Sequence, residues 1–253
     1  MKYYFDTTII NINQEFDNYE LNIVIPIYNE SKNISEVLKN WNEALKKLNI
    51  KFCFILINDG SSDNSVEIIK GLNYEIILLD KHNSGHGRSI RLGYDFSLKH
   101  LKSDYILQID SDGQCDSKYF QNFWNKRKDY DFILGVRKTR GDGLIRYFTS
   151  KISLLLTSIL TYKNLKDPNT PYRLFKKHAL GEALSYIKES FDIQNIAITY
   201  VILKKKNKFS TVEINFPNRI GGENSINLIK VFQMGINMLF DLYFLKKNLK
   251  EKN

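Results

Sequence analysis

The sequence predicts an α/β fold, a doubly wound and mostly parallel sheet with helices on both faces, followed by a C-terminal amphipathic helical extension. Two observations predict it. Short apolar runs of strand length alternate with stretches in which apolar residues recur every three or four positions, as in successive strand–helix units. Polar residues suited to chemistry follow several of these runs, at the positions where open α/β sheets bind ligands.

The first half of the chain supplies most of this pattern. Residues 1–20 are expected to form a short extension, with an added strand as one interpretation. Pro26 is expected to end the first strand because it lacks an N–H, and Gly135 to end the fifth. The expected strands cover 21–26, 51–57, 74–79, 105–109 and 131–134. The expected helices cover 34–48, a short segment capped by Ser62 or Asp63 and ending at 69, 86–101, and 117–128.

The second half is more helical. After a loop at 167–171, strands are expected at 173–175 and 209–216, and the expected helices cover 144–162, the stretch to about 188, 193–203 and 226–245. We therefore expect an extension at 1–20, a main domain at 21–225, and a C-terminal helix with a basic tail at 226–253.

Charge and cysteine content narrow the function classes. The 253 residues include 37 Lys/Arg and 28 Asp/Glu, and the net charge of +9 suits an anionic partner such as nucleic acid, phospholipid or a phosphorylated substrate. Cys53 and Cys115 are too few and too far apart for a disulfide framework, which indicates a reducing compartment. Without a signal peptide or an eighteen-residue apolar run, a cytoplasmic location is expected.

Two carboxylates mark the end of the expected fourth strand. Asp110 and Asp112 follow the apolar run at 105–109, and Gly113 allows the chain to bend directly after them. Such oxygen ligands suit a hard divalent cation, Mg²⁺ or Mn²⁺, which can bridge to substrate phosphates. A solvated turn is the alternative, because Asp and Gly are common turn residues.

Four motifs in order carry a family resemblance. They read IVIPIYNE (23–30), NDGSSDNS (58–65), QIDSDGQ (108–114) and NRIGGENS (218–225). Together they resemble family 2 glycosyltransferases of the GT-A fold, closest to the polyprenyl-phosphate branch that includes dolichol-phosphate mannose synthase. The resemblance implies metal-dependent, inverting transfer of a sugar from a UDP- or GDP-linked donor to a polyprenyl-phosphate lipid.

The resemblance also implies roles on the donor side. The nucleotide-sugar site is expected to contain Pro26, Tyr28, Asn29, Glu30, Asp59, Gly87, Asp110, Ser111, Asp112 and Arg219. Within it, Asp59 would contact the base, Asp110, Asp112 and Gln114 would hold the metal, and Arg219 would stabilise charge growing on the leaving diphosphate. As alternatives, Tyr28 is a core aromatic and Asp59 a turn residue. His86 either faces the diphosphate or caps its helix.

The acceptor side rests on fewer residues. Arg137 lies in a G-x-R segment of the family, and Arg146 and Ser150 share a helical face that suits one phosphate. Arg146 as a snorkelling side chain is the alternative. A phosphate acceptor needs no general base, whereas a sugar hydroxyl of a surface glycan, such as capsule or lipooligosaccharide, needs one. The family's Glu-Asp pair is absent, and Asp192 is the candidate base for that second case.

The C-terminal helix suggests a membrane partner. Lys230 and Asp241 are its only charges over 226–245, and lysines follow directly. An interfacial helix on the anionic cytoplasmic leaflet explains both features, with a core-packing helix as the alternative. A non-enzymatic polyanion-binding protein is the rival class. Its basic residues should interleave with aromatics along one groove, whereas here they cluster near the C-terminus. We therefore expect no nucleic-acid partner. A dinucleotide-binding fold is excluded because the first strand leads into Tyr-Asn-Glu and not a glycine motif.

Overall fold

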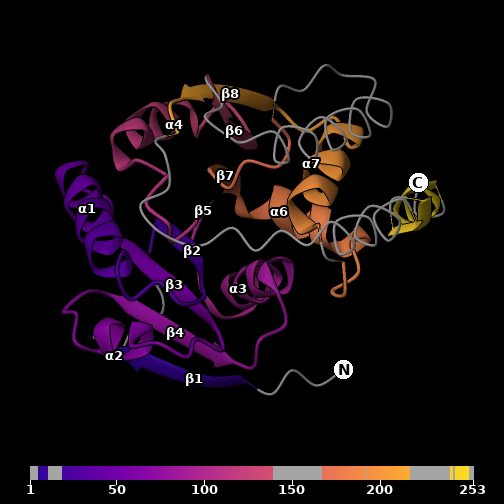
Figure 1. Ribbon diagram of the computed structural model, residues 1–253. Helices are drawn as coiled ribbons and strands as arrows, with labels where there is room; N and C mark the ends of the chain where they lie inside the picture. Colours follow the sequence, from indigo (N-terminus) through magenta and orange to yellow (C-terminus); the bar gives the residue numbers. More distant parts are fainter. Residues whose placement is uncertain are drawn as a thin grey trace.

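The computed structural model describes residues 5–10, 19–138, 167–191, 193–216, 240–241 and 243–250. These residues build one eight-stranded sheet with helices against both faces (Figure 1). The helix expected at 144–162 and most of the one expected at 226–245 lie outside the described residues. Over the described ranges, we find no helix with the length and apolar content needed to cross a membrane.

The sheet is mostly parallel, as predicted. Its order is β1-β4-β3-β2-β5-β7-β6-β8, and β1 and β7 run antiparallel to the strands beside them. The added strand expected in the N-terminal extension is β1, which pairs with β4. The strands are β1 (Phe5–Ile10), β2 (Leu21–Ile27), β3 (Phe52–Asp59), β4 (Ile76–Lys81), β5 (Tyr105–Gln108), β6 (Phe132–Arg137), β7 (Arg173–Lys176) and β8 (Phe209–Ile214).

The helices form two layers, each with its own core. One apolar cluster joins the sheet to α1 and α4, and the other joins it to α3, α6 and α7. Burial of both faces explains why the central strands are apolar throughout and do not alternate. The helices are α1 (Ile34–Lys47), α2 (Ser65–Lys70), α3 (His86–His100), the 3₁₀ turn η1 (Ser117–Tyr119), α4 (Phe120–Lys126), α6 (Lys177–Tyr186) and α7 (Gln194–Lys204).

Two expected strand ends are wrong. β2 continues through Pro26 to Ile27. The Val24 carbonyl accepts a hydrogen bond from Ile109, so the missing N–H of Pro26, two residues on, faces the side on which β5 has already ended. β6 also continues past Gly135, whose N–H donates to the Tyr172 carbonyl at 2.8 Å. A Cβ on this glycine would lie 2.7 Å from the Ile214 side chain, so close packing explains the glycine.

Several further boundaries differ from the expected ones, and two of them lie next to the carboxyl ends of β3 and β4. Asn64, and neither Ser62 nor Asp63, occupies the N-cap of α2, although Asp63 still accepts a hydrogen bond from the Ser65 N–H at 3.0 Å. β4 covers Ile76–Lys81, two residues later than expected, because Asp80 and Lys81 pair with β3 and do not form a loop. The shift matters because it places Lys81 at the carboxyl end of the strand.

Candidate active site

The carboxyl ends of four neighbouring parallel strands form one edge of the sheet. In space the order is β4-β3-β2-β5, and each adjacent pair is parallel. The chain builds β2, β3 and β4 outward on one side and then crosses back to β5 on the other side of β2. The carboxyl ends of the adjacent strands β2 and β5 therefore form a topological switch point, the place where open α/β sheets bind ligands. Asp110 and Asp112 follow β5 at this point.

The turn after β2 is held against the turn after β3. Asn29 has a φ of 54°, a left-handed conformation that Asn tolerates better than most residues. Its N–H donates to Ser61 Oγ at 3.0 Å, and its side-chain Oδ1 accepts from the Ser62 N–H at 2.8 Å. Tyr28, directly before it, is 52% exposed. The alternative of Tyr28 as a core aromatic is therefore wrong, and its ring is available to a ligand at this edge.

The Asp63 carboxylate also links the turn after β2 to the turn after β3. Its carboxylate accepts hydrogen bonds from the Ser31 N–H at 3.0 Å and from the Ser65 N–H and hydroxyl at 3.0 and 2.5 Å. Desolvation alone would raise the pKa of this carboxyl, but the hydrogen bonds from Ser65 and Ser31 outweigh it and lower the pKa to about 2. The Ser65 hydroxyl also accepts from the Glu30 N–H at 2.9 Å, which holds the Tyr-Asn-Glu segment in place.

Replacing Asp63 with asparagine should lower stability by about 1–2 kcal/mol at neutral pH, because charge-assisted hydrogen bonds are lost. A carboxyl whose folded pKa is depressed to about 2 stabilises the protein above the unfolded value near 3.8, and that contribution fades as pH falls toward 2. The difference in the free energy of unfolding between wild type and Asp63→Asn, measured in urea, should therefore become smaller as the pH is lowered from 6 to 3. A constant difference over that range would contradict the assignment.

Asp59, the last residue of β3, is buried and organises the loop before α3. Its Oδ1 accepts from Lys81 Nζ and from the Ser84 N–H at 2.8 Å, and its Oδ2 accepts from the Gly85 N–H at 2.9 Å. Lys81 Nζ also donates to Ser84 Oγ at 2.7 Å. Asp59 is thus more than a turn residue, while its expected contact with a base stays a prediction. Sequence reasoning missed Lys81, although a lysine at the end of an apolar strand before a glycine loop was a visible signal.

The acidic turn after β5 lies beside the first residue of α3. Gly113 has a φ of 77°, which lets the chain reverse so that the Gln114 N–H donates to Asp112 Oδ1 at 3.1 Å. Across the edge, His86 Nε2 is 3.0 Å from Asp110 Oδ1. The N-cap of α3 is Gly85, so His86 does not cap the helix and its ring faces the acidic turn.

Three carboxylates act on His86. Desolvation would lower the pKa of its imidazole, but Asp110, through its charge and its hydrogen bond, and then Asp112 and Asp59 raise that pKa above the usual value. These three carboxylates come from the ends of β3 and β5, and Asp59 and Asp110 contact the neighbouring residues Gly85 and His86. The positive end of the α3 dipole adds to the field that an anionic ligand would meet here.

The donor set at this turn fits a hard divalent cation. Asp110 and Asp112 offer carboxylate oxygens and Gln114 offers an amide oxygen, the ligand types that Mg²⁺ and Mn²⁺ prefer. Over the described ranges, no three His, Cys, Asp or Glu side chains group closely enough to hold a metal ion. A cation here would therefore need Gln114 or oxygens of a bound ligand in addition to the two aspartates.

The expected acceptor residues are only partly described. Arg137, at the end of β6, makes a two-pronged ion pair with buried Asp167, with Nε–Oδ2 and Nη2–Oδ1 distances of 2.5 and 2.9 Å. The other expected acceptor residues, Arg146 and Ser150, and the candidate base Asp192 lie outside the described residues, as does Arg219 of the donor side. Their roles stay predictions.

A second buried arginine holds the loop at 167–171. Arg173 donates to the carbonyls of Pro168 and Thr170 and, in α7, to the carbonyl of Asn195 and the Thr199 hydroxyl. Burial lowers its pKa to about 10.

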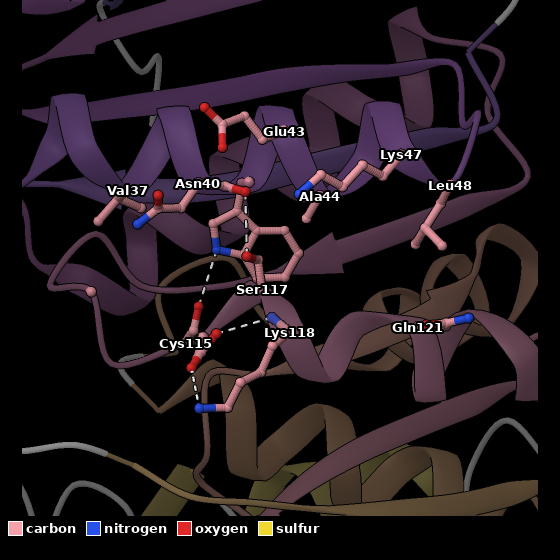
Figure 2. A pocket seen from close by; sticks show the side chains of 13 residues that line it. Val37, Asn40, Glu43, Ala44, Lys47, Leu48, Cys115, Ser117, Lys118 and Gln121 are labelled. Atoms are coloured by element: carbon pink, nitrogen blue, oxygen red, sulfur yellow. Dashed lines mark hydrogen bonds and ion pairs between the residues drawn. The ribbon is translucent and has the colours of Figure 1, made fainter.

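A cavity of about 520 Å³ lies next to the acidic turn, between α1 and residues 113–121. Trp41 Nε1 donates to the Cys115 carbonyl at 3.0 Å, and Lys118 forms an ion pair with Asp116. Figure 2 shows Cys115 and Lys118 on one side of this cavity and Asn40 and Lys47 of α1 on the other. None of the residues expected to bind the donor lines this cavity. Its lining therefore differs from the set of residues expected to bind the donor, although Gly113 of the acidic turn belongs to it.

Comparison with solved structures shows the same fold in sugar-transferring enzymes. Glucosyl-3-phosphoglycerate synthase from Mycobacterium tuberculosis, solved with Mn²⁺, uridine diphosphate and phosphoglyceric acid, aligns with a TM-score of 0.66 at 13% identity, over 90% of this chain and 78% of that one. Mannosyl-3-phosphoglycerate synthase from Rubrobacter xylanophilus aligns with a TM-score of 0.61 at 12% identity, over 92% and 75%.

Curated relatives are similar in sequence. Undecaprenyl-phosphate 4-deoxy-4-formamido-L-arabinose transferase from Shewanella sediminis is 26% identical over 228 residues, 88% of this chain and 65% of the relative. The protein of the same name from Serratia proteamaculans is 25% identical over 229 residues, 88% of this chain and 66% of the relative. The chain thus spans just under two thirds of the length of these relatives. The profile of Glycosyl transferase family 2 matches residues 22–199, well over half of the sequence, and the chain belongs to this family.

Proposed function

We propose that this protein is a metal-dependent, inverting glycosyltransferase that moves a sugar from a nucleotide-sugar to a polyprenyl phosphate. The observation that carries the proposal is that Asp59 and Asp110 contact the neighbouring residues Gly85 and His86 at the start of α3, beside the switch point, with Asp112 in the same turn as Asp110. Family membership and the names of the undecaprenyl-phosphate relatives support it.

On the donor side, the strand ends would bind the nucleotide. The exposed ring of Tyr28 would stack on the base, and Asp59 would present its carboxylate edge to a base N–H while holding the loop at Gly85. Asp110, Asp112 and Gln114 would hold a divalent cation. When bound, that cation supplies positive charge to the leaving diphosphate. Arg219, outside the described residues, would add a second positive charge that matters most as the bond breaks.

On the acceptor side, a lipid phosphate is favoured. A phosphate is already an anion and attacks the anomeric carbon without a general base, consistent with the absence of a Glu-Asp pair in this sequence. Arg137, Arg146 and Ser150 would bind it. For Arg137 this requires sharing its guanidinium with Asp167. A sugar hydroxyl of a surface glycan, with Asp192 as base, is the second candidate acceptor.

We assign this chemistry to residues 21–225, which contain the whole family match, and treat 226–253 as an accessory segment. A lipid acceptor also implies that the protein works at a membrane surface, which we propose is the cytoplasmic face.

The deciding experiment is a screen of UDP- and GDP-sugars with Mn²⁺, Mg²⁺ or EDTA, in the presence of a detergent-dispersed polyprenyl phosphate or a glycan with free hydroxyls. Release of nucleoside diphosphate is the readout. We expect release that requires a divalent cation and the lipid phosphate, and we expect UDP plus Mn²⁺ to raise the melting temperature without any acceptor. Turnover with the glycan alone would select the second acceptor. No turnover and no stabilisation with any donor would refute the proposal.

A further inference from the structure

The C-terminal helix carries an unusual outward surface. Residues 243–250 are helical, as are 240–241. Within 240–250, every residue described as exposed is either aromatic or lysine. We call Phe240, Tyr243, Phe244, Lys246, Lys247 and Lys250 the aromatic–lysine surface. Its three aromatics are 63%, 67% and 46% exposed, and the other large exposed hydrophobic in the described residues is Tyr28, at the donor site.

The opposite face of this helix is already used. Leu245 and Leu249 are buried in the core formed with α6 and α7, and Asn248 Nδ2 donates to the Tyr186 carbonyl at 3.5 Å. Asp241, the acidic residue of this segment, is half-buried and not part of the outward face. Packing of the two leucines therefore fixes the rotation of the helix about its axis. In this orientation the aromatic side chains point away from the core.

Exposed aromatics gathered in this way indicate a binding surface, because isolated apolar residues are common on proteins but clusters are not. The chemistry of the surface matches a lipid–water interface, where aromatic rings enter the headgroup region and lysines meet anionic headgroups. Lys188, from the loop after α6, adds a further cation with its Nζ 4.8 Å from the centre of the Phe244 ring. Figure 1 shows this helix at the edge of the molecule beyond α6 and α7, on the side away from α1.

We infer that the aromatic–lysine surface docks the protein on anionic lipid bilayers, with Phe240, Tyr243 and Phe244 inserted at the interface and Lys246, Lys247 and Lys250 on the headgroups. This deepens the proposed function, since a membrane-embedded acceptor must be reached from the bilayer surface. The docking itself requires neither donor nor acceptor.

The test is sedimentation with phosphatidylcholine vesicles, with and without phosphatidylglycerol, at low and high salt. Three variants are compared with wild type. The aromatic variant is Phe240→Ser/Tyr243→Ser/Phe244→Ser, and the lysine variant is Lys246→Gln/Lys247→Gln/Lys250→Gln. The matched control, Lys39→Gln/Lys46→Gln/Lys47→Gln, removes the same charge from exposed positions of α1 on the other side of the molecule.

We expect wild type to bind anionic vesicles at low salt and to be released by salt. The aromatic variant should lose at least about tenfold in affinity, and the lysine variant about fivefold per lysine. The control should bind like wild type. Melting curves verify folding, and a Phe240→Trp variant gives a second readout. On vesicle binding, the fluorescence emission of the new Trp should shift to the blue and be quenched by lipids brominated in the acyl chain. The buried Trp41 and Trp124 give a background that is measured in wild type and subtracted.

Several outcomes would overturn the inference. Wild type would fail to bind anionic vesicles, or the aromatic variant would bind them as well as wild type. Or the control would lose as much vesicle affinity as the lysine variant. Alternatively, wild type would form a concentration-dependent dimer that is absent in the aromatic variant. Turnover of detergent-dispersed acceptor is measured in parallel. For wild type, turnover without vesicle binding would refute the docking surface alone, and vesicle binding without turnover would refute the proposed function alone.

Discussion

Replacing Asp112 is expected to abolish sugar transfer while the protein stays folded. In the proposed site Asp112 holds the cation that neutralises the leaving diphosphate, so its loss removes stabilisation that grows in the transition state. We expect turnover to fall by about 10²–10³-fold or more for Asp112→Ala and Asp112→Asn. The measurement is nucleoside diphosphate release, together with Mn²⁺ binding in the presence of UDP.

Two variants separate chemistry from folding in this test. Asp112 is buried and accepts the Gln114 N–H, so the alanine variant should also lose about 1 kcal/mol of stability. Asparagine keeps the shape and an acceptor oxygen, and should lose turnover with little change in stability. Asp116→Asn, four residues on in the same segment, is the control and should stay active. Full activity of Asp112→Asn would remove the mechanism.

Replacing Lys81 with methionine is expected to destabilise the protein by about 3–5 kcal/mol, because it leaves the buried Asp59 carboxylate without its cation. The Ser84 and Gly85 amides would remain as its partners, but they do not balance the charge. Urea unfolding of Lys81→Met, Asp59→Asn and the double variant measures the coupling. The double variant should be more stable than Lys81→Met.

The exposed pair Lys118–Asp116 supplies the comparison for Lys81. Lys118 is 65% exposed, so solvent screens its ion pair and Lys118→Met should leave stability nearly unchanged. If Lys81→Met costs no more than Lys118→Met, the loop amides alone hold Asp59. Loosening of the Ser84–Gly85 loop should also weaken donor binding in Lys81→Met, visible as a smaller rise in melting temperature with UDP and Mn²⁺.

Much of the fold was predictable because it depends on local patterns. The apolar runs of the central strands and the three- to four-residue period of α1 and α3 reflect burial that each segment must achieve in any α/β fold. Two strand ends were misjudged for a physical reason. Whether Pro26 or Gly135 stops a strand depends on which neighbour lies beside it, and that is a property of the assembled sheet.

The residues of the candidate site also fall into two groups, those predictable from local patterns and those that depend on the assembled structure. Asp59, Asp110 and Asp112 were predictable because carboxylates at the ends of parallel strands must meet at one edge of the sheet. Lys81 and His86 acquire their partners only through contacts between separate strand–helix units, with Asp59 and Asp110 respectively. The partners of Arg173 also depend on the tertiary structure, because they come from a loop and from helix α7.

The sequence alone determined the family, the order of strands and helices, and the acidic positions at the strand ends, because these follow from residue type and spacing along the chain. Only the tertiary structure decided that Tyr28 is exposed, that Lys81 neutralises Asp59, and that Phe240, Tyr243 and Phe244 face outward. The physical reason is that periodicity shows that a helix or strand has two faces, but the choice of buried face depends on the surfaces available to pack against it.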